Sequence, residues 1–194
     1  MDKSLLSDMA IESIKELAEH LKVVAVKILE DGIRPNPDIV KFDMINFYDK
    51  EHKIDGMVCH SAACAIGHFA VMRDFTYDRD GVYDNNKDFF TWRDFSRQYI
   101  DISQWGEQAV IWEWLFSGKW AWCDNSPLGV VARIEHFLEF GVPNEFILCP
   151  VFQDNGIYSQ VAEDIKSAVV APYLERRKAL EAECLATHNL TRYA

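Results

Sequence analysis

Residues 125–143 read NSPLGVVARIEHFLEFGVP and contain the clearest helix signals in the chain. Ser126 is a favoured N-cap residue, and Pro127 follows at the first helical position, where its fixed φ suits a helix. Gly141 is a typical stop residue, and Pro143 lies just beyond it. These signals predict a helix over residues 127–140, and helical patterns extend to both sides of it.

The N-terminal part of the chain also shows helical periodicity. Apolar residues recur at three- and four-residue steps over residues 5–29, and Gly32 is a fitting C-terminal stop. A short helix is predicted over residues 38–48, although its β-branched and aromatic residues leave a strand as the alternative. Ser61 is the expected N-cap of a buried helix over residues 62–72.

The central part of the chain combines a polar stretch with two further helical patterns. Residues 73–90 are rich in Asp and Asn, which predicts a long loop. Thr91 is the expected N-cap of a helix over residues 92–99, and Ser103 is the expected N-cap of a helix over residues 104–116.

A long final helix is predicted to start near Ser159, and Pro172 lies inside it. Because proline removes a helical hydrogen bond, this helix should be kinked or broken near Pro172. A length of 194 residues favours one domain. The predicted fold is therefore all-α, an irregular single-domain bundle of about six or seven helices over residues 1–194. Residues 159–194 are the candidate for a C-terminal helical appendage.

The charge balance limits the classes of partner. The formal net charge is −11, from 20 basic and 31 acidic residues, and residues 101–164 alone hold ten acidic and two basic residues. Nucleic-acid binding needs a basic stripe that contacts phosphates, and the sequence contains none, so direct nucleic-acid binding is not expected. A concentrated acidic surface favours a protein partner with a basic surface, although acidic residues can also serve solubility alone.

Two features of the sequence bear on the cellular compartment of the protein: its segments of apolar residues and its cysteines. There is no basic leader followed by an apolar segment, and no apolar run long enough to span a bilayer, so no membrane association is expected. The five cysteines form an odd count, which is typical of reduced thiols and predicts a cytoplasmic protein.

The segment CHSAACAIGH begins at Cys59 and offers the ligand types that zinc prefers. His60, Cys64 and His68 are spaced by four residues, so they would share one face of a helix. A structural zinc site usually has two close pairs of ligands from separate elements, and no second pair is present. We expect no cofactor, because free cysteines usually pack a core; a metal at Cys59, His60, Cys64 and His68 is the alternative.

A cysteine nucleophile is the second chemical alternative. Cys59 would precede a helix N-terminus, where the helix dipole lowers the pKa of a thiol. His136 could serve as the base and Asp124 could orient it, but nothing in the spacing links the three residues. The motifs of the common nucleotide-binding, hydrolase and zinc-protease families are absent, which favours a non-enzymatic protein.

Five of the six tryptophans lie between residues 105 and 122. Tryptophan is enriched at interface hot spots, and aromatic side chains beside acids suit a groove for a basic partner. Trp112 and Trp114 are two residues apart, so one helix face cannot bury both. The alternative is that these rings fill the core of a small bundle. The predicted binding residues are Glu107, Trp112, Glu113, Trp114, Trp120, Trp122, Asp124 and Glu135.

Two stretches together resemble a known group of sequences. The first is CHSAACAIGH at residues 59–68, and the second joins WLF at 114–116, DNSP at 124–127 and ARI at 132–134. They resemble a loosely defined family of small uncharacterised proteins from bacteria, phages and mobile elements. The resemblance implies a core built from helices over residues 59–72 and 127–140, and a phage or mobile-element origin. It implies no catalytic role, because the family has no established activity.

The sequence therefore predicts a non-enzymatic acidic module that binds a protein with a basic surface. A phage or mobile-element inhibitor would act in this way by occluding a host or defence protein. The alternatives are an enzyme that uses Cys59 or the Cys/His set, and a small-ligand sponge with a Trp-lined pocket in a homo-oligomer.

Overall fold

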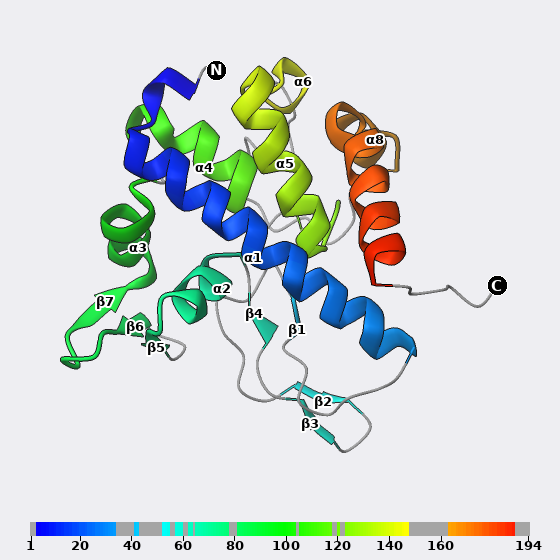
Figure 1. The fold of residues 1–194 in the computed structure, drawn as a ribbon. Helices are drawn as coiled ribbons and strands as arrows, with labels where there is room; N and C mark the ends of the chain where they lie inside the picture. The colour runs from blue at the N-terminus through cyan, green and yellow to red at the C-terminus, as the bar shows by residue number, and fades with distance from the viewer. Residues whose placement is uncertain are drawn as a thin grey trace.

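The computed structural model is an irregular all-α bundle (Figure 1). Three long helices dominate it, α1 (Asp8–Ile33), α5 (Pro127–Phe140) and α8 (Glu163–Thr187), and α5 packs against both of the others. None of the described helices is long and apolar enough to cross a lipid bilayer. The structural description covers residues 3–33, 41–42, 52–54, 57–59, 62–63, 65–77, 81–103, 105–117, 120, 123–147 and 163–188.

Helix α5 has the bounds that the sequence predicts, from Pro127 to Phe140. The Ser126 hydroxyl caps it by accepting a hydrogen bond from the Gly129 N–H at 3.0 Å. Gly141 ends it with a φ of 81°, a conformation that favours glycine. Because α5 lies between α1, α4 and α8, it is buried on several faces at once.

Helix α1 confirms the amphipathic pattern of the N-terminal part. Ile14, Leu17 and Leu21 lie one turn apart and are fully buried, as the three- and four-residue spacing predicts. The opposite face carries exposed acids and lysines, including the ion pair between Lys15 and Glu12. One stripe of α1 therefore covers the core while the other faces solvent.

Helix α8 runs without interruption through Pro172, so the chain is not split there. The helix changes direction in its orange N-terminal half (Figure 1). Proline has no N–H, so the carbonyl of Ala168 lacks its usual helical donor. Tyr173 and Leu180 of α8 are buried in the core that α1 and α5 also form.

Shorter helices surround these three. Thr91 caps α3 as predicted, because its hydroxyl accepts a hydrogen bond from the Asp94 N–H at 3.2 Å. The prediction for Ser103 was wrong: Gly106, with a φ of 72°, interrupts the helical run, and α4 begins only at Ala109. The short helices are η1 (Lys3–Leu5), α2 (Ala65–Met72), α3 (Trp92–Phe95), the π-helix η2 (Ser96–Ile100), η3 (Gly106–Gln108), α4 (Ala109–Phe116) and α6 (Asn144–Ile147).

Small strands occupy segments that the sequence predicts as helix or loop. Strand β1 (Lys41–Phe42) runs parallel to β4 (Ala62–Ala63), so the expected helix over 38–48 is wrong at residues 41–42. Helix α2 starts at Ala65 instead of residue 62, which removes Ser61 as its N-cap. A second pair, β2 (His52–Ile54) and β3 (Met57–Cys59), is antiparallel.

The predicted loop over residues 73–90 contains a three-stranded antiparallel sheet in the order β5 (Thr76–Tyr77), β6 (Gly81–Tyr83), β7 (Phe89–Thr91). The turn between β6 and β7 is built by Asp84, whose carboxylate accepts hydrogen bonds from the N–H groups of Asn86 and Asp88. The polar composition that predicts a loop therefore describes this turn, and strands this short show little periodicity.

Candidate functional site

Three of the four tryptophans predicted as a binding surface are core residues. Trp114 and Trp120 are fully buried and Trp112 is 6% exposed, so these three rings do not face a partner. Helix α4 buries both Trp112 and Trp114 because the two rings meet different neighbours: Trp112 packs on Phe116, and Trp114 packs on residues from α6 and α8. Trp122 lies outside the described residues.

The predicted acids fall into different environments. Glu107 is exposed on η3, as a binding residue should be, whereas Glu113 is only partly exposed. Glu135 forms ion pairs with Lys22 at 3.4 Å and Arg176 at 2.5 Å. Its charge therefore joins α5 to α1 and α8 and is not available to a partner.

Two of the predicted residues, Trp120 and Asp124, meet three residues that were not predicted, at the point where α4, α5 and α8 pack together. We call Asp124, Trp120, Arg133, Tyr173 and Arg177 the Arg133 cluster. The Arg133 guanidinium lies 4.0 Å from the centre of the Trp120 ring and 5.8 Å from that of Tyr173. Further rings from Trp114 and Phe146 pack on the same tryptophan.

Asp124 holds the polar half of this cluster together. Its carboxylate accepts hydrogen bonds from the Ser126 hydroxyl at 2.7 Å and the Tyr173 hydroxyl at 3.1 Å, and it lies 3.2 Å from Nε of Arg177. A Cβ atom on Gly129 would meet this carboxylate at 2.3 Å, so only glycine fits there. Burial raises the pKa of Tyr173 well above its usual range, which keeps its hydroxyl a neutral donor.

The proposed catalytic residues are not assembled in the described part of the chain. His136 packs on the rings of Trp114 and Phe140, whereas Asp124 is engaged by Ser126, Tyr173 and Arg177. Cys59 is the last residue of β3, and its side chain lies outside the structural description. Asp124 therefore acts here as a structural acceptor and does not orient His136.

For the metal alternative, only the His68 side chain is described; His60 and Cys64 lie outside the described residues. His68 on α2 is 1% exposed and its ring faces that of His20 on α1, with the centroids 5.8 Å apart. The described residues contain no group of three or more metal ligands. Nothing in the sequence links His20 with His68, because the helices that bear them are joined by a long connection.

The half-buried His20 imidazole predicts a pH-dependent stability. Burial, with a smaller contribution from Lys27, lowers the pKa of His20 from its ordinary 6.5. The unfolded chain therefore binds a proton at a higher pH than the folded chain does, so stability is complete above about pH 6.5 and is lost as the pH falls through that value. We expect the urea midpoint to fall over this range, and His20→Gln to reduce the fall. His188→Gln is the control, because His188 is exposed, and it should leave the pH profile unchanged. An equally unchanged profile for His20→Gln would contradict this assignment.

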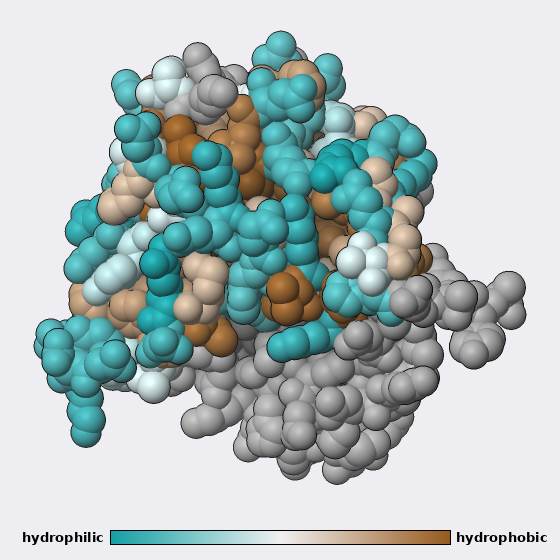
Figure 2. Space-filling model, in the orientation of Figure 1, coloured by the Kyte–Doolittle hydropathy of each residue, from teal (hydrophilic) through white to brown (hydrophobic). Residues whose placement is uncertain are grey.

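Beside the Arg133 cluster, α5, α6 and α8 enclose an open groove of about 730 Å³. We call it the Phe140 groove, because Phe140 on its rim is 68% exposed. Figure 2 shows that the coloured part of this face is mostly hydrophilic, with apolar side chains in the gaps between the hydrophilic ones. The groove is lined by His136, Phe140, Val142, Pro143, Asn144, Glu145, Ala168, Ala171 and Pro172.

The electrostatics of this groove are acidic. Burial lowers the pKa of His136, against the opposing effects of Glu139, Glu145 and a hydrogen bond with the backbone of Pro172. Both glutamates are exposed, and neither forms an ion pair with a described residue. The groove lining therefore includes one exposed carboxylate, that of Glu145, beside apolar side chains of α5 and α8. The exposed Glu139 lies next to the groove on α5 and acts on the same histidine.

Apart from His136, which was considered only as a catalytic base, the groove residues were missed in the sequence because they come from three separated helices and the link between two of them. The signal that the sequence offers for this groove is Phe140, a large apolar residue at the end of a predicted helix. No protein-family model, curated protein or solved structure matches this chain, so its function is inferred from its own residues.

Proposed function

We propose that this protein is a non-enzymatic binding module whose Phe140 groove receives a basic segment of another protein. The observation that carries the proposal is the exposed Phe140 beside Glu139 and Glu145, two exposed glutamates that form no ion pair with a described residue. An apolar floor with an acidic rim suits a segment that combines an apolar side chain with lysine or arginine. This replaces the tryptophans of α4 as the interface, since those rings are buried.

The backbone at Pro172 adds a second reason for a basic partner. The carbonyl of Ala168 lacks its usual helical donor because of Pro172, and both residues line the groove. A lysine or arginine side chain can donate to such a carbonyl while its charge remains close to Glu145. An acidic partner would be repelled by the carboxylates of the groove and would bring no donor for the carbonyl of Ala168, so its binding would be weaker.

As a biological role we propose inhibition by occlusion. A phage or mobile-element protein of this type would cover a basic surface on a host or defence protein, and thereby block whatever that surface binds. The net charge of −11 favours fast, salt-sensitive association with such a surface.

The test compares proteins captured from a bacterial lysate by tagged variants, quantified by mass spectrometry at low and high salt. Phe140→Ser and the double variant Glu139→Lys/Glu145→Lys should each lose the same captured protein. Phe89→Ser is the matched apolar control, because Phe89 is 48% exposed on β7, at the opposite end of the molecule from α6 and α8 (Figure 1). A partner retained by both groove variants would refute the proposed interface.

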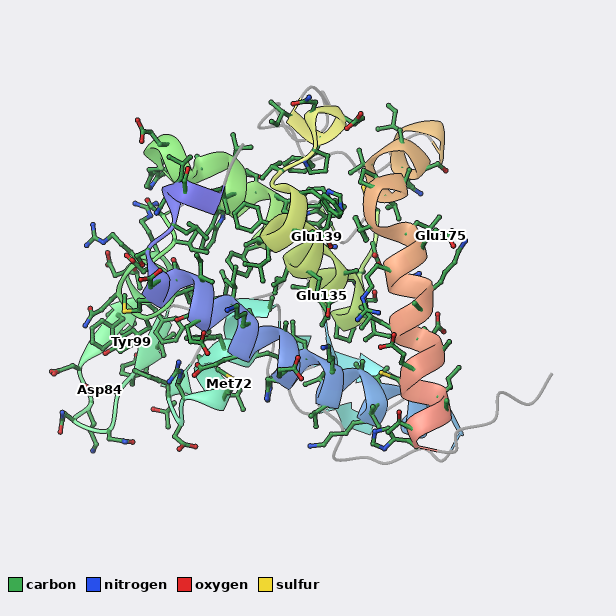
Figure 3. All side chains as sticks on the ribbon, turned by 45° about the horizontal axis from the view of Figure 1, so that its top comes forward. Met72, Asp84, Tyr99, Glu135, Glu139 and Glu175 are labelled. Atoms are coloured by element: carbon green, nitrogen blue, oxygen red, sulfur yellow. The ribbon has the colours of Figure 1, made fainter. Side chains whose placement is uncertain are left out.

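A matched charge control is needed because reversing two glutamates also changes the net charge. Glu12→Lys/Glu175→Lys makes the same change on exposed faces of α1 and α8. Figure 3 shows Glu175 on the side of α8 that points away from α5, whereas Glu139 lies on α5. Equal loss of binding in both double variants would indicate a nonspecific charge effect and would contradict a groove-specific interaction.

A further inference from the structure

Arg133 is a buried cation whose hydrogen-bonding groups are not used. The residue is 0% exposed. Its Nε, Nη1 and Nη2 atoms make no hydrogen bond of good geometry within the described residues. The Tyr173 hydroxyl interacts with the guanidinium, but it already donates its proton to Asp124 and does not saturate the donors of Arg133. A guanidinium carries five N–H donors in one plane, and burying them without acceptors is unfavourable. Arg133 therefore needs a partner that the contacts described above do not supply.

The aromatic rings next to Arg133 interact with the flat face of its guanidinium and not with its N–H groups. Trp120 lies 4.0 Å from the Arg133 carbon Cζ, so the ring covers a face of the cation. The N–H groups point outward in the plane of the guanidinium, where a stacked ring provides no acceptor. Stacking therefore holds Arg133 in place and leaves its edge available.

The charges of the cluster do not cancel. Arg133 and Arg177 are both cationic, whereas Asp124 is the one carboxylate among the residues of the cluster. Arg177 lies 3.2 Å from that carboxylate, which also accepts from Ser126 and Tyr173. Arg177 is 32% exposed and therefore partly solvated, whereas Arg133 is fully buried. Because Tyr173 is neutral and Asp124 pairs with Arg177, the buried cation has no carboxylate of its own within the cluster.

We propose that the edge of Arg133 binds one carboxylate or phosphate group of a small molecule. Both groups match the planar fork of a guanidinium through two parallel hydrogen bonds, and each supplies the missing negative charge. The proposal is independent of the Phe140 groove, since it concerns the buried cluster and a small anion instead of a protein partner.

The test measures the thermal unfolding of the full chain after dialysis into chloride buffer. Inorganic phosphate or acetate is then added at constant ionic strength. We expect the Tm of the wild type to rise with anion concentration, because a ligand that binds only the folded state stabilises it. Arg133→Met, which keeps much of the side-chain length without charge or donors, should abolish the rise.

Two further variants keep the test decisive. Arg133→Lys retains the charge but not the fork, so the apparent Kd should weaken by about tenfold or more. Arg97→Met removes an exposed cation, 71% exposed, and should leave the response unchanged. If Arg133→Met does not fold, the lysine variant provides the comparison, together with native mass spectrometry of freshly purified wild type for a bound anion.

The proposal is overturned if phosphate and acetate shift the wild-type Tm no more than chloride does and no anion co-purifies. The counter-charge of Arg133 would then come from this chain or from water. It is also overturned if the lysine or methionine variant keeps the full wild-type response. Either result leaves the Phe140 groove unaffected, since that proposal is tested by protein capture.

Discussion

Replacing Asp124 with alanine is expected to lower the free energy of unfolding by about 3 kcal/mol or more, because it removes the acceptor at the centre of a buried network. Tyr173 would lose its hydrogen-bond partner in the interior, and Arg177 would lose its counter-charge. The Ser126 cap would lose its contact with the same carboxylate. Urea unfolding followed by circular dichroism measures the change.

Two comparisons separate the contributions of Asp124. Asp124→Asn keeps the shape and an acceptor oxygen but removes the charge, so its cost should be smaller, about 1–2 kcal/mol. Asp88→Ala removes an exposed carboxylate on the β6–β7 turn and should change stability by less than about 0.5 kcal/mol. An alanine variant at Asp124 that matched the Asp88 variant would contradict the central position assigned to this carboxylate.

Replacing Trp114 with alanine is expected to cost about 3–5 kcal/mol, the usual range for deleting a buried aromatic side chain. Trp114 is fully buried, and its ring contacts Trp120, Phe146 and Tyr173 at centroid distances of 5.4, 5.0 and 5.7 Å. Its indole N–H also donates to the carbonyl of Arg133 at 3.1 Å. Chemical denaturation of the purified variant measures the loss.

Two related variants test whether Trp114 is a core residue and not a binding residue. Trp114→Phe keeps most of the buried area but removes the indole donor, so the Arg133 carbonyl keeps only its helical partner and a cost of about 1–3 kcal/mol is expected. Trp105→Ala removes a ring that is 62% exposed and packs on Arg93, and should cost less than about 1 kcal/mol. If Trp114→Ala lost partner binding while it kept full stability, the assignment to the core would be wrong.

Strong local signals predict the helices. Ser126, Pro127 and Gly141 define α5 because caps and stops act through neighbouring backbone atoms. The same logic succeeds at Thr91 and fails at Ser103, where Gly106 adopts a left-handed conformation that the sequence alone does not reveal. Strands of two or three residues escape detection because periodicity needs longer segments.

The candidate site is harder to predict, because it depends on contacts between distant segments. The sequence identified Asp124 and Trp114 as notable residues, but it could not show that both are buried or that Tyr173 and Arg133 meet them. For Pro172 the sequence predicts a kinked or broken helix, and α8 continues through it with a change of direction (Figure 1). The sequence does not predict that this residue lines the groove. Burial and long-range packing decide these roles, and one sequence contains neither directly.

The most direct test of the proposed function is hydrogen exchange of the wild-type protein with and without the protein recovered by capture. We predict that binding slows amide exchange in the C-terminal turn of α5, in α6 and in α8 near Pro172. The β6–β7 turn should exchange at the same rate with and without the partner. Slowed exchange confined to other surfaces, with these groove segments unchanged, would contradict the account.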